Sequence, residues 1–339
     1  MKSFETREYW LDLVKGVAII GVVLQHSLQR TIFFFDQSEN AWLTVSNSFI
    51  DSSNMQWFFV VSGVIYFMKR EKYLQDIRKF IRVRFYDLMI PYIILGPLVW
   101  LGKYIFSSYV KNPVTMDDLL NMFVVPIAFM WYIYVLFVIE VLVILIDKFV
   151  LFSYRYKLAF FFFLCFSLAL TTTYSKDIFW RTSFFIFWYY LGGLFYSHKE
   201  KIKSYAGILS TVGGGFWIVF FVMALYVAND FFGFVSTAAS VLFLTTFFMR
   251  HQNRTNLNGL FNFLGNKTMY IYILNPIIIN SLRQVLLIFE VDCMIISLLI
   301  FIFWHSNNCL YYCNDSSQNT TIGVCLFTKK IHSKKIVII

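Results

Sequence analysis

Three ionisable residues in the first apolar segment, Asp12, Lys15 and His26, have the spacing that chemistry on one helix face requires. Lys15 and His26 are eleven residues apart, which is close to three full helical turns, and Asp12 precedes Lys15 by about one turn. At the usual helical rise, Lys15 and His26 are roughly 16 Å apart along the axis. A neutral histidine suits general-base or proton-transfer chemistry near neutral pH. Ionisable groups at membrane depth are costly, so this alignment favours a catalytic role over a structural histidine that bonds a neighbouring helix.

A second candidate site is the basic segment from Lys69 to Arg84, which leads directly into Pro91 and Tyr92. Clustered Arg and Lys side chains suit phosphate groups, because they offer positive charge and, in Arg, bidentate hydrogen bonding. The alternative is that these charges set the membrane topology and attract anionic lipids, and charge alone favours this alternative. The cations of the segment are Lys69, Arg70, Lys72, Arg78, Lys79, Arg82 and Arg84.

Three further polar positions lie inside apolar runs. Glu140 has two open interpretations, an ion pair with a cation such as Lys15 or Arg181, or a catalytic role. Asn275 precedes a proline, and an interhelical hydrogen bond is its simpler explanation. Ser62 is followed by glycine, and this small pair favours close helix packing over a nucleophilic serine.

The composition predicts an all-α polytopic membrane protein. Of 339 residues, 59% are hydrophobic and only 14% are charged, and the mean hydropathy of +0.65 is far above that of soluble domains. Apolar runs long enough for a ~30 Å hydrocarbon core predict about ten transmembrane helices, at residues 13–34, 52–68, 86–107, 122–147, 157–174, 179–196, 206–227, 231–249, 268–288 and 291–304.

The charges of the connecting loops predict the orientation of these helices. Lysine and arginine gather after the second, fourth, sixth and eighth predicted spans, whereas the other loops are richer in Asp and Glu. By the positive-inside rule, both termini are expected to be cytoplasmic, in a multi-pass protein of the cell (inner) membrane. No small-residue cleavage site precedes the first span, so no removable signal peptide is expected. The formal charge of +10 is then explained without a nucleic-acid partner.

The predicted membrane domain covers residues 1–304, and residues 305–339 form an atypical polar tail to which we assign no function. Cys309 and Cys313 have a spacing that fits a metal pair, but the only later histidine is His332, so no metal site is predicted. The chain has no Walker loop, dinucleotide fingerprint, H-E-x-x-H or G-x-S-x-G motif, which leaves ATP-driven transport and soluble-type hydrolase chemistry without support.

Five segments together point to a protein family. They are R-E-Y-W-L-D-L-V-K-G-V-A-I-I-G-V-V-L-Q-H, W-F-F-V-V-S-G, R-F-Y-D-L-M-I-P-Y, M-W-Y-I-Y-V-L-F and L-G-N-K-T-M-Y-I-Y-I-L, and they span roughly residues 5 to 280. In this order they resemble the acyltransferase 3 family of integral membrane O-acyltransferases, and in particular its fucose 4-O-acetylase-like branch. The resemblance implies ten or so helices, an acyl-CoA donor taken from the cytoplasm, and an acyl group delivered to a sugar hydroxyl.

The resemblance also implies roles for individual residues. His26 corresponds to the family's essential histidine, Lys15 to its basic partner, and Arg84 to an arginine associated with donor binding. The chain departs from the family pattern at two positions. Asp87 stands where a second basic residue is usual, and Asn275 stands where histidine is common.

The resulting hypothesis is transfer of an acyl group, expected to be acetyl, from cytoplasmic acetyl-CoA to a glycan acceptor across the lipid bilayer. Lys79, Arg82 and Arg84 are expected to hold the donor's nucleotide and phosphates. His26 either takes the proton of the acceptor hydroxyl or briefly carries the acyl group, and the sequence leaves both routes open. Acyl-CoA is a substrate here, and no permanently bound cofactor is expected.

Two other functions remain compatible with the sequence. A flippase or transporter of lipid-linked sugars explains the ten spans and the charged residues inside them, but it has no reason to bind coenzyme A. A non-catalytic relative that keeps only the fold is the third possibility.

Overall fold

The computed structural model describes residues 8–34, 38–107, 113–171, 175–227, 229–252 and 255–288. Every regular element in these ranges is a helix, which confirms the all-α class. The helices form two compact units. The first contains the chain up to Phe58 and from Glu200 onward, and the second contains Phe59–Lys199.

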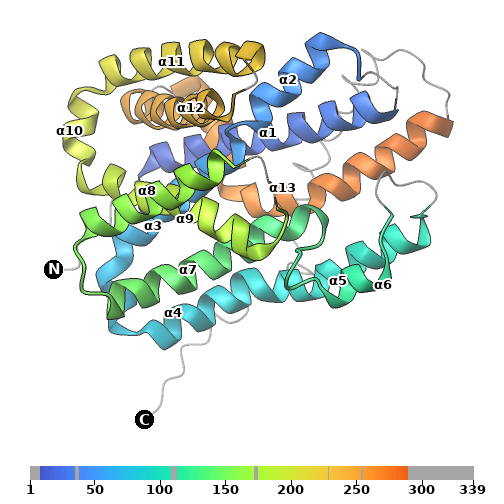
Figure 1. The fold of residues 1–339 in the computed structure, drawn as a ribbon, viewed down its shortest axis with the longest axis horizontal. Helices are drawn as coiled ribbons and strands as arrows, with labels where there is room; N and C mark the ends of the chain where they lie inside the picture. The colour runs from blue at the N-terminus through green and yellow to red at the C-terminus, as the bar shows by residue number, and fades with distance from the viewer. Residues whose placement is uncertain are drawn as a thin grey trace. The chain divides into compact units, whose positions relative to one another are not determined.

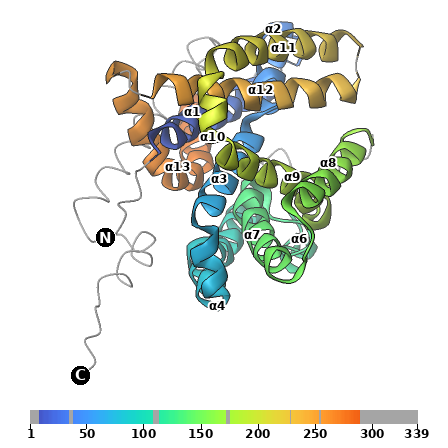
Figure 2. The same ribbon diagram turned by 90° about the vertical axis from the view of Figure 1, so that its left-hand side faces the viewer.

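The first unit is built on two helix pairs. Helices α1 (Tyr9–Phe34) and α13 (Thr255–Ile288) pack against each other, and α11 (Ala206–Val227) packs against α12 (Asp230–His251), as both views show (Figures 1 and 2). The short helix α2 (Ala41–Asp51) contacts α1, and the first turn of α3 (Asn54–Gln75) follows it. Helix α10 (Lys199–Ser204) leads into α11.

The second unit begins with the remainder of α3. It continues through α4 (Ile77–Arg84), the π-helix η1 (Phe85–Met89), α5 (Ile90–Ile105), α6 (Met116–Leu120), the 3-10 turn η3 (Ala128–Met130), α7 (Trp131–Phe149), α8 (Tyr154–Ala169) and α9 (Ile178–Ser197). Helix α9 packs against both α7 and α8.

Among the described residues, four helical segments are long and apolar enough to cross a membrane: Tyr9–Phe33, Ile77–Ile105, Ala206–Val227 and Asp230–His251. They agree with the first, third, seventh and eighth predicted spans, although the third begins nine residues earlier than predicted, because basic α4 continues into η1 and α5. The count of ten spans and the cytoplasmic termini stay predictions. The span at 291–304 and the tail at 305–339 lie outside the described residues.

Several helices begin at a polar side chain that satisfies a free backbone N–H. Asp76 caps α4 by accepting a hydrogen bond from Lys79 N at 2.9 Å. Asp177 caps α9 in the same way through Trp180 N at 2.7 Å. The hydrogen bonds that Asp177 accepts from the Ser175 hydroxyl and from Trp180 lower the pKa of its carboxyl group below the usual value. The hydrogen bond from the Lys79 N–H to Asp76 fixes the start of α4, the helix that carries Lys79, Arg82 and Arg84.

The π-helix η1 has a local cause in the sequence. Pro91 has no N–H to donate to the carbonyl of Asp87, and its ring crowds that carbonyl. The helix widens one turn before the proline, and the Ile90 N–H bonds the Phe85 carbonyl five residues earlier. Such π-turns are frequent at functional sites, and this one starts directly after Arg84.

Glycine allows the backbones of α1 and α13 to touch. A Cβ atom built on Gly16 would lie 2.3 Å from the carbonyl oxygen of Phe261, and one on Gly265 would lie 2.0 Å from that of Asp12. Neither distance leaves room for a methyl group. The same device operates in the second unit, where a Cβ on Gly63 would lie 1.9 Å from the Tyr189 carbonyl oxygen, which confirms the packing interpretation of the Ser62-Gly63 pair.

We expect Gly265→Ala to destabilise the first unit by about 1–3 kcal/mol, because the new methyl group must push α1 and α13 apart. The matched control is Gly259→Ala on the same helix, where a Cβ would meet no atom within 4 Å. Since alanine favours the helix, the control should keep or raise stability. Thermal unfolding in detergent measures both, and equal midpoints for the two variants would contradict the contact.

Candidate functional site

One continuous helix, α1, carries the three predicted catalytic residues. Lys15 Nζ lies 2.7 Å from Asp12 Oδ1, with 23% of the lysine side chain and 9% of the aspartate side chain exposed. His26 is half-buried further along the same helix, roughly 16 Å from Lys15 along the axis. The structure thus brings Asp12 and Lys15 together as an ion pair and keeps His26 in a fixed position relative to them.

The basic helix α4 carries the three predicted donor-binding residues, and they differ in burial. The side chains of Lys79 and Arg82 are exposed. Arg84 instead turns toward α7, where its Nε lies 2.9 Å from Oε2 of Glu140, a carboxylate that is only 1% exposed. The guanidinium carbon of Arg84 is also 5.6 Å from the centre of the Phe80 ring. Two cations are therefore available to a ligand, and the third is engaged by a buried carboxylate.

The prediction that Glu140 pairs with a cation such as Lys15 or Arg181 is wrong. Glu140 pairs with Arg84. Arg181 has different contacts, because its guanidinium carbon lies 4.2 Å from the centre of the Trp131 ring and its Nε donates to the Lys176 carbonyl at 3.0 Å. An ion pair between helices depends on which faces meet in three dimensions, and the spacing along the chain does not contain that information.

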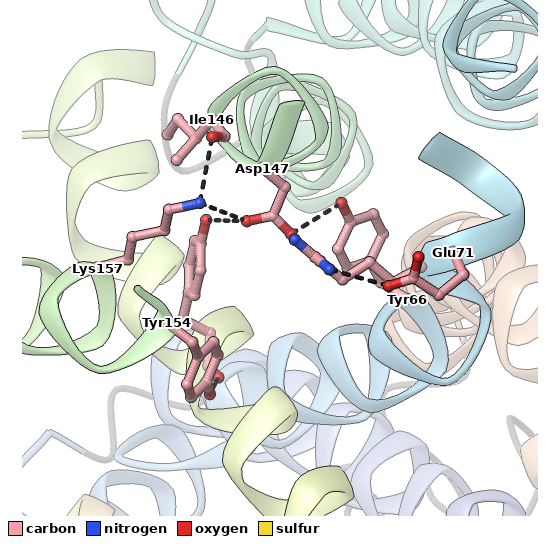
Figure 3. A network of polar contacts seen from close by, with 8 residues as sticks. Tyr66, Glu71, Ile146, Asp147, Tyr154 and Lys157 are labelled. Carbon is pink, nitrogen blue, oxygen red and sulfur yellow. Dashed lines mark hydrogen bonds and ion pairs between the residues drawn. The ribbon is translucent and has the colours of Figure 1, made fainter. Parts of the chain in front are cut away.

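A third polar cluster, centred on Asp147 at the end of α7, was missed by sequence reasoning (Figure 3). Arg70 Nε lies 2.7 Å from one carboxylate oxygen, and Lys157 Nζ lies 3.1 Å from the other. The hydroxyls of Tyr66 and Tyr190 donate to the same carboxylate at 3.3 and 3.2 Å. Burial disfavours the charge of Arg70, but its hydrogen bond to Asp147 and the attraction of that carboxylate outweigh burial and raise the pKa of its guanidinium.

The Asp147 cluster joins four helices, because its members come from α3, α7, α8 and α9. Each of the two carboxylate oxygens of Asp147 already has one cation and one tyrosine hydroxyl as partners, which leaves little capacity for a ligand. The cluster is therefore a structural hub of the second unit. Nothing in the local sequence distinguishes Asp147 from an ordinary interfacial aspartate. Lys157 resembles a loop cation in the sequence, but only 8% of its side chain is exposed.

Asn275 on α13 is fully buried, yet neither its Oδ1 nor its Nδ2 has a hydrogen-bond partner among the described residues. The interhelical hydrogen bond predicted for this side chain is therefore not found in the described part of the chain. An unsatisfied carboxamide costs about 1–3 kcal/mol in a protein interior.

The comparison with known proteins decides the family. The sequence model of a family described as an acyltransferase domain matches residues 8–306, which include α1, the basic segment and α13. The chain belongs to this acyltransferase family. The resemblance seen in the five sequence segments is thereby confirmed.

Individual relatives match a smaller part of the acyltransferase chain. Proteins called glucans biosynthesis protein C, from Escherichia coli K12 and from Escherichia coli O1:K1 / APEC, are 34% identical to it over 110 residues. This match covers 31% of the chain and only 28% of each relative. No solved structure matches the chain.

Removal of Arg84 should expose the cost of burying Glu140. We expect Arg84→Met to destabilise the second unit by about 3–5 kcal/mol, because the buried carboxylate loses its partner. The double variant Arg84→Met/Glu140→Leu should recover most of this loss, and Arg82→Met, which changes an exposed cation of the same helix, should have little effect. Chemical or thermal unfolding in detergent measures all three, and a double variant no more stable than Arg84→Met would contradict the pairing.

Proposed function

We propose that the chain is an integral membrane O-acyltransferase that moves an acyl group, preferentially acetyl, from cytoplasmic acetyl-CoA to a sugar hydroxyl of a cell-surface or exported polysaccharide. The family match over residues 8–306 carries the proposal. Two further observations support it. The apolar helices suit a membrane enzyme, and the name of the glucans biosynthesis protein C relatives points to a polysaccharide acceptor.

The chemistry requires a base for the acceptor hydroxyl, and we assign this role to His26. In the direct route, the imidazole takes the hydroxyl proton, the oxygen attacks the thioester carbonyl, the carbon–sulfur bond breaks, and the coenzyme A thiolate leaves and takes up a proton. In the covalent route, the imidazole nitrogen attacks the thioester carbonyl, the carbon–sulfur bond breaks and the coenzyme A thiolate leaves and takes up a proton. The acceptor oxygen then attacks the acyl carbon, the carbon–nitrogen bond breaks, and the released imidazole takes the hydroxyl proton. Either route is compatible with a half-buried histidine on a rigid helix.

The Asp12–Lys15 pair contributes a charge distribution that is fixed in place. Lys15 is held by the carboxylate one turn earlier, so its ammonium position on α1 is defined. A held cation can attract the polar end of an acyl donor or the oxyanion that forms during transfer. Because the pair is partly buried, this attraction is screened less than it would be at an open surface.

Lys79 and Arg82 are the residues of the basic helix that we assign to the donor's phosphates. Both are exposed, whereas Arg84 is committed to Glu140. Arg84 consequently supports the donor site by anchoring the end of α4, and we assign it no direct contact with phosphate.

Replacement of the histidine tests the central assignment. In membranes given radiolabelled acetyl-CoA, His26→Ala should lower transfer to polysaccharide by at least about 100-fold, because general-base help is worth about 10²–10⁴ in rate. His198→Ala is the matched control, since His198 is exposed at the end of α9 and should leave transfer unchanged. Retention of most activity by His26→Ala would reject the role.

Coenzyme A binding by the same membranes separates the enzyme from a sugar flippase. Both the wild type and His26→Ala should bind coenzyme A, because the histidine acts on the acyl group and not on the nucleotide. A folded wild-type chain that neither binds coenzyme A nor transfers label would overturn the proposed function.

The exposed cations test the donor site. Lys79→Gln and Arg82→Gln should each raise the KM for acetyl-CoA by about two- to fivefold, as expected for exposed ionic contacts. The effect should shrink as salt is added, since exposed charges are screened. Lys203→Gln, on exposed α10, removes the same charge elsewhere and should leave KM unchanged. If Lys79→Gln and Arg82→Gln had the same KM for acetyl-CoA as Lys203→Gln, the basic segment would only set the membrane topology and would not bind the donor.

A further inference from the structure

The second half of α1, which carries His26, packs against α2 through apolar side chains. Leu28 of α1 and Leu43 of α2 are buried in this contact. The partly buried side chains that pack around them are Leu24, Ile32 and Ile50. Apolar contacts of this kind are not directional, so they favour burial of this face of α1 without defining one rotation of the helix about its axis. A directional contact is needed to define that rotation.

Gln25, the neighbour of His26 on α1, supplies a directional contact. Its side-chain nitrogen donates to the carboxylate of Asp51, the last residue of α2. Its side-chain oxygen accepts a hydrogen bond from the Asn54 side-chain nitrogen at 3.5 Å, in the first turn of α3. Only 7% of Gln25 is exposed, so water has little access to these bonds. One carboxamide therefore ties α1 to two other helices.

Gly21, one turn before Gln25, lets the first turn of α3 come close to α1. A Cβ atom at position 21 would lie 2.3 Å from Asn54 Oδ1, a distance that leaves no room for a side chain. Asn54 itself is only 1% exposed. The same face of α1 that bears Gln25 is thus in direct contact with the start of α3, and the hydrogen bonds of Gln25 are formed at a close helix approach.

The corner between α2 and α3 is held in turn by α12. The Thr237 hydroxyl donates to the Ser52 carbonyl at 2.8 Å. The indole nitrogen of Trp57 donates to the Ser240 hydroxyl at 3.3 Å. Gln25 is therefore bonded to a segment that is itself anchored, so its two hydrogen bonds set the position of α1 at this level.

These contacts define the direction in which the His26 side chain leaves the helix. Consecutive residues of an α-helix point roughly 100° apart around the axis. When Gln25 faces α2 and α3, His26 must therefore lie on an adjacent face, the one that also carries Lys15. A base that is misplaced by about 1 Å can lose about 100-fold in rate. A small rotation of α1 would suffice for such a displacement.

We infer that Gln25 and Asp51 are positioning residues for His26, because their hydrogen bond fixes the rotation of α1 at the level of the imidazole. The inference rests on the proposed function, in which His26 acts on the acceptor hydroxyl or carries the acyl group. Neither positioning residue touches a substrate in this assignment. Their contribution therefore belongs to the chemical step and not to the binding of either substrate.

Steady-state kinetics of purified full-length protein in lipid nanodiscs test the inference. Radiolabelled acetyl-CoA is the donor, and soluble oligosaccharides released from the host's surface polysaccharide are the acceptor. Gln25→Met keeps the length of the side chain but cannot donate a hydrogen bond, and Asp51→Ala removes the acceptor. Each variant should lower kcat by about 10- to 100-fold and leave both KM values within about twofold of the wild type.

Two further variants identify the hydrogen bond as the cause. Because both single substitutions break the same bond, Gln25→Met/Asp51→Ala should be no slower than the slower single variant. Asp51→Asn keeps an acceptor oxygen in the same place and loses only its charge, so it should keep kcat within about threefold of the wild type.

Two controls separate positioning from stability. Ser236 is fully buried and donates to the Trp217 carbonyl at 3.2 Å, so Ser236→Ala also removes a buried hydrogen bond of the first unit. It should lower the thermal midpoint and leave kcat unchanged. Asp230→Ala removes an exposed carboxylate at the start of α12 and should leave kcat unchanged as well.

Three results would overturn the inference: an unchanged kcat in Gln25→Met, an equal fall of kcat in Gln25→Met and Ser236→Ala, or a raised KM for the oligosaccharides with kcat unchanged. The second would trace the loss to stability, and the third would make Gln25 a substrate contact. In each case, transfer by the wild type and its loss in His26→Ala would still uphold the proposed function. A wild type without transfer would overturn both.

Discussion

The contact between the backbones of α1 and α13 is the constraint on which the first unit depends. Two apolar helices in a membrane gain little from the hydrophobic effect when they associate, so close van der Waals packing must hold them together. Gly16 and Gly265 permit that packing, and a side chain at either position would collide with a carbonyl group. Helix α1 is consequently immobilised, with Leu13, Val14, Ala18 and Val22 fully buried. Only a helix fixed in this way can keep Lys15, Gln25 and His26 at constant positions.

Two buried carboxylates of the second unit have cationic partners on other helices. In the second unit, the carboxylate of Asp147 is surrounded by two cations and two hydroxyls, and Glu140 has Arg84. Such saturated clusters rigidify a fold and leave little capacity for a ligand. In the first unit, the oxygens of Ser53, Asn54 and Gln56 stay unsatisfied among the described residues, although each lies in a well-held segment. The second unit also holds such groups, among them the hydroxyls of Thr182 and Tyr189, so a buried group without a hydrogen bond does not by itself mark a ligand site.

The sequence was sufficient for features that depend on spacing along one helix. The all-α class follows from composition, and the Asp12–Lys15 pair follows from a separation of one turn. It was insufficient where partners come from different helices. Arg84 and Glu140 are 56 positions apart, and the Asp147 hub extends from Tyr66 to Tyr190, which are 124 positions apart. Both depend on which helix faces meet. A proline disturbs the helical turn before it, but only the structure shows that the disturbance before Pro91 is a π-turn directly after Arg84.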